Sequence, residues 1–238
     1  MAFRKKYQKV IDLKPDLLVL QECENDAKLK KHLESVAYNQ LIWYGKNPHK
    51  GVAVISFNEV HIELDPKHNS AFEYVIPFKL TVNNRQIDLY AIWAMPHEES
   101  RARSYVGQIW AAMNYYVADL DRESILIGDF NSNAIWDHNR KVGNHTELIS
   151  FLNAKNIYSV YHQLTNSEHG AEKHPTLYLT KNEAKPYHMD YCCASKSLFS
   201  ENTSIKIGVY EDWIKLSDHM PVIIDTVSYT HLTLPTKA

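Results

Sequence analysis

The chain has 238 residues, of which 45% are hydrophobic, with a formal net charge of −2 and a pI near 6.7. This length and apolar content are enough for one large domain with its own core. The near-neutral charge excludes the strongly basic class of nucleic-acid-binding proteins, but a local basic face would be enough for an enzyme that binds DNA briefly.

Cysteine usage and hydropathy exclude further classes. The three cysteines, Cys23, Cys192 and Cys193, form neither an even disulfide framework nor a C-x-x-C pair. The charged start of the chain is not typical of a signal peptide, and no apolar run approaches the ~20 residues of a membrane helix. We therefore expect a monomeric, cytoplasmic protein with reduced cysteines and no membrane span.

The first half of the chain begins with a helix and continues with strands. An amphipathic helix is predicted over 2–13 and ends at Pro15. The all-apolar run 17–20 predicts a strand that is buried on both faces. Further strands are predicted at 52–57, 72–82 and 86–93. The dipeptide Asn83-Asn84 is typical of a hairpin turn between the last two.

The second half contains two helices among strands. The longer helix is predicted over 100–120, where apolar residues recur at helical spacing. Four of its side chains are expected in the core: Tyr105, Ile109, Met113 and Tyr116. A second helix is predicted over 146–154, with Asn144 as its N-cap. Strands are predicted at 124–127, 177–179, 189–194, 204–210 and 222–224.

This element order predicts an α/β (α+β) fold. Many strands, hairpin signals and a few long helices indicate a four-layer sandwich, in which two packed, mostly antiparallel β-sheets are flanked by helices. We expect a single domain over 1–226. Residues 227–238 continue neither periodic pattern, and we interpret them as a non-native C-terminal tail.

Four short polar motifs stand at predicted strand ends. They are QE at 21–22, GDFN at 128–131, HMD at 188–190 and SDH at 217–219. Because strand side chains alternate, Asp129 and Asn131 are expected to point one way while Phe130 enters the core. Gathered at one edge of two sheets, the motifs would form a charged, oxygen-rich crevice. Carboxylates suit Mg²⁺ and an imidazole can bind or protonate a phosphate oxygen, so the motifs favour phosphoester hydrolysis.

The ordered set QE, GDFN, HMD and SDH is similar to that of the endonuclease/exonuclease/phosphatase superfamily. Exonuclease III, abasic-site endonucleases, pancreatic-type deoxyribonuclease, neutral sphingomyelinases and inositol-polyphosphate phosphatases belong to it. The resemblance extends roughly from Pro15 to Asp225. It implies a phosphoester hydrolase that uses Mg (or Mn) and water, without a protein nucleophile.

The resemblance also implies a role for each motif residue. Asp129 would orient or deprotonate the attacking water, and Asn131 would hold the phosphate or that water. His219 would contact a phosphate oxygen, with Asp190 as the carboxylate that fixes its ring. The metal residues implied in the same way are Glu22 and Asp218.

Several further residues are candidates for substrate binding. They are His97, Arg101, Arg103, Trp136 and His188. Each has a structural alternative: a solvated helix start for the arginines, aromatic packing for Trp136, and a supporting role beside the site for His188. The thirteen histidines include no H-x-x-x-H pair and no Cys/His cluster, so close spacing predicts no zinc site.

One expected element of the superfamily is not found in this sequence. Members normally begin with a strand that ends in Asn, often as W-N-x-N, and that Asn helps to bind the metal. This chain starts directly at the following helix. We interpret this as a start codon assigned too late or as a cloned fragment. When a strand inside a sheet is missing, its neighbour leaves a pairing edge exposed. We therefore expect a form with the strand restored to be more stable and more active.

Three functions remain open from the sequence. The leading one is a nuclease that cleaves DNA or RNA by water attack on phosphate, chosen because nucleases are frequent in the superfamily. The second is a phosphatase or phosphodiesterase that acts on a small molecule, an inositol phosphate or a lipid headgroup. The third is an inactive binding domain, against which the retained Glu22, Asp129, Asn131, Asp190 and His219 argue.

Overall fold

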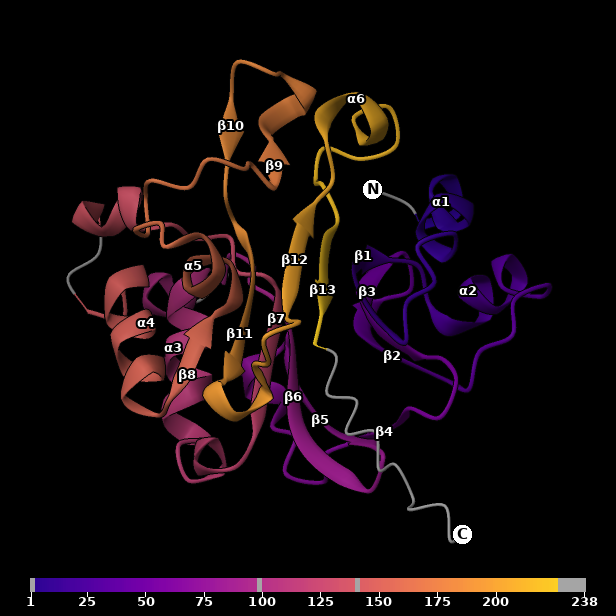
Figure 1. The fold of residues 1–238 in the computed structure, drawn as a ribbon, viewed down its shortest axis with the longest axis horizontal. Coiled ribbons are helices and arrows are strands. Elements are labelled where there is room, and N and C mark those ends of the chain that lie inside the picture. Colours follow the sequence, from indigo (N-terminus) through magenta and orange to yellow (C-terminus); the bar gives the residue numbers. More distant parts are fainter. Residues whose placement is uncertain (1–2, 98–99, 140–141, 227–238) are drawn as a thin grey trace, which may run out of the picture.

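Two layers of β-sheet form the centre of the molecule in a computed structural model that describes residues 3–97, 100–139 and 142–226 (Figure 1). The larger sheet has six strands, in the order β4 (His61–Leu64), β5 (Val75–Val82), β6 (Arg85–Trp93), β7 (Ser124–Asp129), β11 (Asp190–Ser195) and β8 (Ile157–Ser159). Neighbouring strands are antiparallel except for β6 and β7, which run parallel. The carboxyl end of β7 and the amino end of β11 therefore meet at one edge.

The second layer consists of two separate pieces of sheet. One has three strands, in the order β1 (Leu17–Cys23), β3 (Lys50–Ser56) and β2 (Gln40–Asn47), and the other pairs β12 (Ser204–Ile207) with β13 (Val222–Asp225). Their apolar faces pack on the larger sheet in one shared core. Among the described residues, β1 and β13 each pair along one edge only. A small ladder of β9 (Leu177–Tyr178) and β10 (Pro186–Tyr187) lies apart from both layers.

Helices cover the outer faces of both layers and complete a four-layer sandwich, as predicted. The helices α3 (Val106–Tyr115) and α4 (His145–Ala154) pack on the larger sheet, and α1 (Tyr7–Ile11) and α2 (Asp26–His32) pack on the three-stranded sheet. Two short helices, α5 (Val160–Thr165) and α6 (Tyr210–Trp213), lie in the second half of the chain. In the described part of the chain, no helix is long and apolar enough to cross a membrane.

Short 3₁₀ segments connect the main elements. They are Phe3–Lys5, Ser70–Phe72, Arg101–Arg103, Asp119–Asp121, Ala134–Asn139, Leu179–Lys181 and Lys196–Leu198. Residues 227–238, which we interpreted as a tail, lie outside the described residues.

Local sequence signals located two connections correctly. Asn83 and Asn84 both have positive φ, at 49° and 62°, which is the conformation that a two-residue hairpin turn requires between β5 and β6. Asn144 caps α4, and its side chain accepts a hydrogen bond from the backbone N–H of Glu147.

The predicted long helix over 100–120 is wrong in extent. Its regular part is only α3, because Tyr105 adopts a left-handed φ of 53° and donates its N–H to the carbonyl of Met95. That contact ties the start of the helix to the end of β6. Tyr105 is consequently 43% exposed, so its assignment to the core is also wrong, whereas Ile109, Met113 and Tyr116 are buried.

Other local predictions differ in detail. The predicted helix over 2–13 is a 3₁₀ turn followed by the short α1. Leu17, Leu18 and Val19 are only partly buried, so β1 is not covered on both faces as the all-apolar run predicted. The sequence analysis missed α2, β2 and β4, since these segments mix charged and apolar residues without a clean period.

Candidate active site

The site begins where β7 and β11 pair. Asp129 and Asp190 are direct partners in the antiparallel register, so their side chains leave the sheet at the same place. Gly128 makes this end of β7 possible, because it has a φ of 140° and a Cβ there would lie 2.0 Å from the carbonyl oxygen of Ile92. The GDFN motif thus needs its glycine for close packing of β7 against β6.

His219 reaches this pair of carboxylates from the loop before β13. Its backbone forms an isolated bridge with Leu177, and its N–H is held by Ser217 Oγ at 3.1 Å. Its Nδ1 donates to Asp190, at 2.9 Å from Oδ2 and 3.2 Å from Oδ1. Donor atoms of Asp129, Asp190 and His219 all lie within 4.8 Å of one another. Two carboxylates and one oriented imidazole therefore form a compact cluster.

Asn131 orients the carboxylate of Asp129. Its backbone N–H donates to Asp129 Oδ1 at 2.9 Å, and its side-chain amide donates to Asp129 Oδ2 at 3.1 Å and to the carbonyl of Ala94 at 3.0 Å. Phe130, between them, is fully buried. Asp129 and Asn131 do meet on the polar side, but not by strand alternation: β7 ends at Asp129, and Asn131 has a left-handed φ of 46° that turns its side chain back to Asp129.

Crowding of the carboxylates changes the protonation of the cluster. Burial raises the pKa of Asp129, and the neighbouring charge of Asp190 raises it further. For His219, burial favours the neutral ring, but Asp190, Asp129 and Asp218 outweigh it and raise the pKa to about 9. The cluster at neutral pH thus combines an imidazolium with a carboxylate of unusually high proton affinity.

Glu22 and Asp218 stand beside this cluster. Glu22 lies at a register shift in β1 and has a φ of 53°. Its Oε1 forms an ion pair with Lys50 Nζ, at a distance of 3.4 Å. The charge of Glu22 contributes to the raised pKa of Asp129, and that of Asp218 to the raised pKa of His219. All four sequence motifs therefore act on one place in the fold.

The charge of Lys6 interacts with the carboxylates of the site, which the sequence did not predict. Burial lowers the pKa of its ammonium group, while the charges of Asp190, Asp218 and Glu22 act in the opposite direction. Its cation thus lies in the field of the same carboxylates that form the site. No signal in the sequence separates Lys6 from the other lysines of the amphipathic N-terminal segment, because its role depends on how that segment packs.

The residues at this site fit a divalent cation. The donor set is dominated by carboxylate oxygens, which are the ligands that Mg²⁺ and Mn²⁺ prefer. The raised pKa of Asp129 reflects an excess of negative charge that a bound cation would relieve. The carboxylates of Asp129 and Asp190 offer oxygen atoms for such an ion, and the charges of Glu22 and Asp218 add to the negative field around them.

The remaining candidates have local contacts. His97 Nδ1 accepts from the N–H of Ser100, and the backbone N–H of His97 donates to Ser104 Oγ, which braces the loop before α3. Trp136 packs against Tyr187, with ring centroids 5.3 Å apart. Arg103 is exposed, and the side chain of Arg101 lies outside the described residues. His188 is only 5% exposed, and its Nδ1 donates to the carbonyl of His174. A substrate role for these residues stays a prediction.

The four-layer sandwich is a fold shared with solved nucleases and with a protein described as a member of the endonuclease/exonuclease/phosphatase family. The chain is similar over 94% of its length to a 3′-5′ exonuclease, NExo, from Neisseria meningitidis, with 18% identity, a TM-score of 0.65 and 95% of that chain covered. The same coverage and TM-score apply to an AP endonuclease from Archaeoglobus fulgidus, at 16% identity. An endonuclease/exonuclease/phosphatase family protein from Leptotrichia buccalis is 15% identical, with a TM-score of 0.56, and 94% of this chain and 91% of that chain are covered.

At these identities the likeness concerns the fold. No family model matches the chain. No curated protein sequence matches it either.

Proposed function

We propose that this protein is a divalent-metal-dependent phosphodiester hydrolase, and specifically a nuclease that cleaves DNA or RNA by attack of water on phosphate. The observation that carries the proposal is the cluster of Asp129, Asp190 and His219, whose donor atoms lie within 4.8 Å of one another. This cluster combines a proton acceptor, Asp129, with a charged donor, His219, and we propose that Glu22 and Asp218 beside it add carboxylates for a cation. Hydrolysis of a phosphate ester requires these three parts.

Each residue of the cluster has a defined part in the proposed reaction. Asp129, held by Asn131 and raised in pKa, takes the proton from the attacking water. His219, kept protonated and oriented by Asp190, donates a hydrogen bond to a phosphate oxygen. Glu22 and Asp218 are the residues that we propose hold the metal. When bound, Mg²⁺ or Mn²⁺ supplies positive charge to the phosphoryl oxygens.

A nucleic-acid substrate is supported by what the similar structures are described as. NExo is described as a 3′-5′ exonuclease and as a 3′ phosphatase, and one of its structures holds a product DNA hairpin. The Archaeoglobus protein is described as an AP endonuclease. We carry the substrate class of these proteins, nucleic acid, over to this chain as part of the proposal. Experiment must identify the bond that is cleaved.

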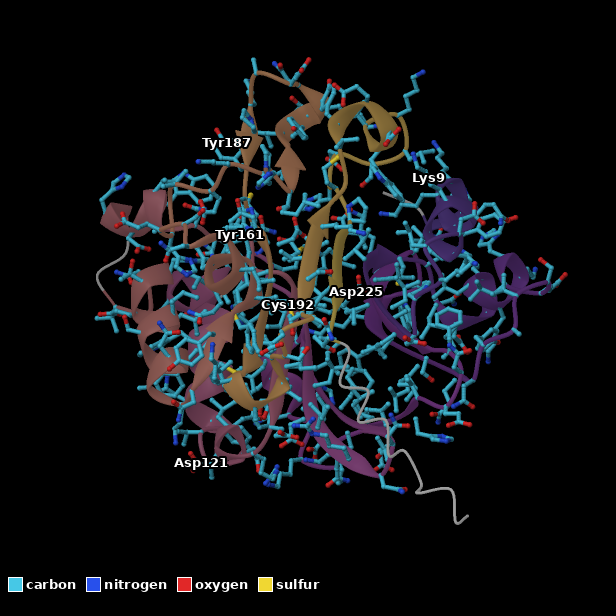
Figure 2. All side chains as sticks on the ribbon, in the orientation of Figure 1. Lys9, Asp121, Tyr161, Tyr187, Cys192 and Asp225 are labelled. Carbon is cyan, nitrogen blue, oxygen red and sulfur yellow. The ribbon has the colours of Figure 1, made fainter. Side chains whose placement is uncertain are left out.

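The test is cleavage of a labelled DNA duplex that carries one abasic site, with Mg²⁺ and with chelator. The wild-type chain should nick it only with the metal, and Asp129→Asn and His219→Ala should lose the activity. Matched controls are His138→Ala and Asp121→Asn, because both side chains are exposed. Figure 2 shows Asp121 at the opposite end of the molecule from Tyr187.

Three results would change the proposal. Cleavage that persists in chelator would contradict metal dependence, and equal cleavage by Asp129→Asn would contradict the assigned site. Hydrolysis of a small phosphomonoester without any cleavage of DNA or RNA would replace the nuclease by a phosphatase. For a polymeric substrate, affinity should also fall steeply with salt, because each contacted phosphate releases counterions.

A further inference from the structure

A second group of metal-ligating side chains lies in α5 and in the loop that leads to β9. His162, His169 and Glu172 each offer a donor atom, and these atoms all lie within 4.8 Å of one another. None of the three belongs to the four motifs of the candidate active site. Tyr161, next to His162 in the chain, marks this region in Figure 2.

The three side chains form a closely packed cluster. The rings of His162 and His169 are stacked, with centroids 3.5 Å apart, and His162 Nε2 lies 3.2 Å from Glu172 Oε1. The side chains of His162 and Glu172 are 8% and 3% exposed. His145 adds a further buried imidazole, whose Nε2 shares a hydrogen bond of 2.9 Å with His169 Nδ1. Three imidazoles and one carboxylate therefore share one small region.

His188 gives an independent indication of a ligand. Its ring is only 5% exposed and stands edge-on to that of His162, with centroids 6.2 Å apart. Its Nδ1 is used by the carbonyl of His174, while its Nε2 is buried without a hydrogen-bond partner among the described residues. His188 and Glu172 also line one cavity of about 160 Å³, which gives a small ion a route to the cluster.

Hydrogen bonds behind the cluster hold its members in a geometry suited to a metal. Ser159 Oγ lies 2.7 Å from His162 Nδ1, and His162 Nε2 lies at hydrogen-bond distance from Glu172 Oε1. An ion at Nε2 would replace the proton of that second bond and leave a proton on Nδ1, where Ser159 Oγ can accept it. The other oxygen of Glu172 accepts from the amide of Asn133 and from the N–H of Gly170, each at 3.1 Å. Supports of this kind fix the tautomer and the orientation of metal ligands.

We propose that His162, His169 and Glu172 form a binding site for one zinc-class divalent ion, separate from the active-site cluster. Two imidazoles and a carboxylate are a set that Zn²⁺ accepts in proteins, whereas Mg²⁺ favours oxygen donors. His188 Nε2 is a further buried nitrogen, without a hydrogen-bond partner among the described residues. The ion connects α5 to the loop before β9, and through Asn133 and Glu172 it supports the segment that follows GDFN.

The experiment measures metal binding, so its result does not depend on the proposed function. Metal-free protein is titrated with Co²⁺, followed by its visible absorption, and then with Zn²⁺ in competition, and bound zinc is counted by elemental analysis. We expect one tightly bound Zn²⁺ and a melting temperature that rises with zinc concentration. His169→Ala should lower the zinc affinity by more than about 100-fold, and Ser159→Ala, which removes only a supporting hydrogen bond, by about 10–100-fold.

Three variants make the assignment specific. His219→Ala should keep the zinc ion, and so should the exposed His138→Ala. If His169→Ala does not fold, Glu172→Gln, which keeps the shape and removes the charge, replaces it in the comparison. Unchanged zinc affinity in His169→Ala or Glu172→Gln would overturn the proposal, as would loss of the ion in His219→Ala alone. In either case the histidines would form a hydrogen-bonded network without a metal.

Discussion

The two polar clusters of this molecule both combine carboxylates with imidazoles, but in opposite proportions. In the first, two carboxylates surround one imidazole, and the pKa of His219 rises to about 9. In the second, imidazoles surround one carboxylate, and the pKa of His169 falls to about 3. Both histidines lie in sheltered surroundings that by themselves favour the neutral ring. The charge of the neighbours, and not shelter alone, therefore decides which histidine is protonated.

This difference separates the two clusters in metal preference as well. Carboxylate-rich sites select hard cations such as Mg²⁺ and Mn²⁺, and imidazole-rich sites select zinc-class ions. Tyr191 follows Asp190 of the first cluster on β11, and its ring stacks on His162 and His169 of the second, with centroids 6.2 Å apart in each case. One strand, β11, thus supports both sites, and variants at and around it can separate their roles.

The largest expected effect is on turnover. Asp129→Asn keeps the shape of the side chain and can still accept the hydrogen bond from the N–H of Asn131, but it cannot take a proton. We expect turnover to fall by about 10²–10⁴-fold, the range that a positioned acid or base contributes. Nicking rates of the folded variant and of Asp121→Asn, at the same metal concentration, check this. A rate for Asp129→Asn equal to that of Asp121→Asn would remove Asp129 from the mechanism.

The next effect concerns pH. Asp190→Asn removes the charge that contributes most to keeping His219 protonated, so burial should bring the pKa of His219 down from about 9. If the protonated ring is the active form, the alkaline limb of the pH–rate profile should move to lower pH by at least about one unit. The profile is measured with saturating Mg²⁺ and substrate. An alkaline limb at the same pH in both proteins would mean that another group titrates there.

The same linkage should appear in stability without metal. Because the pKa of His219 in the folded protein lies above its usual 6.5, the stability that it contributes is fully present below pH 6.5 and is lost as the pH rises through about 9. Urea unfolding in chelator, at about pH 6 and about pH 9.5, should therefore show a larger loss for the wild type than for Asp190→Asn. Equal losses would show that Asp190 does not control this proton.

A smaller effect is expected at Tyr191. Tyr191 Oη accepts from the amide of Asn133 at 3.1 Å and donates to the carbonyl of His188 at 3.0 Å. Tyr191→Phe removes both bonds within a buried region, so the free energy of unfolding should fall by about 1–3 kcal/mol. Urea unfolding compares it with Tyr115→Phe, since Tyr115 is 57% exposed. Equal stability of the two variants would mean that the hydroxyl of Tyr191 is replaced by water.

The parts of the fold and site that could be predicted are those in which a few consecutive residues determine the geometry. The Asn83-Asn84 turn and the Asn144 cap depend on local backbone rules. The motif order then located the strand ends that meet at the active-site cluster, because each motif follows or precedes a recognisable apolar run.

The parts that could not be predicted depend on contacts between distant segments. Tyr105 fits a helical stripe in the sequence, but the carbonyl of Met95 holds its backbone out of the helix. Lys6 is one lysine among many until the N-terminal segment packs beside the site. The spacing of His162, His169 and Glu172 matches no short zinc motif, because the cluster closes only when the loop folds back on α5.

The smallest expected effect tests burial without neighbouring charge. Burial alone raises the pKa of the Cys192 thiol to about 12, and it also raises that of the adjacent Cys193 on the same strand, β11. Because the thiolate is the reactive form, neither cysteine should react appreciably with iodoacetamide at about pH 8 in the folded protein, and both should react in denaturant. Mass spectrometry of the labelled chain counts the modified sites. Rapid labelling of Cys192 under native conditions would show that β11 opens to solvent. The difference in histidine pKa between the two clusters would then have to be explained by exposure and not by the charges around each histidine.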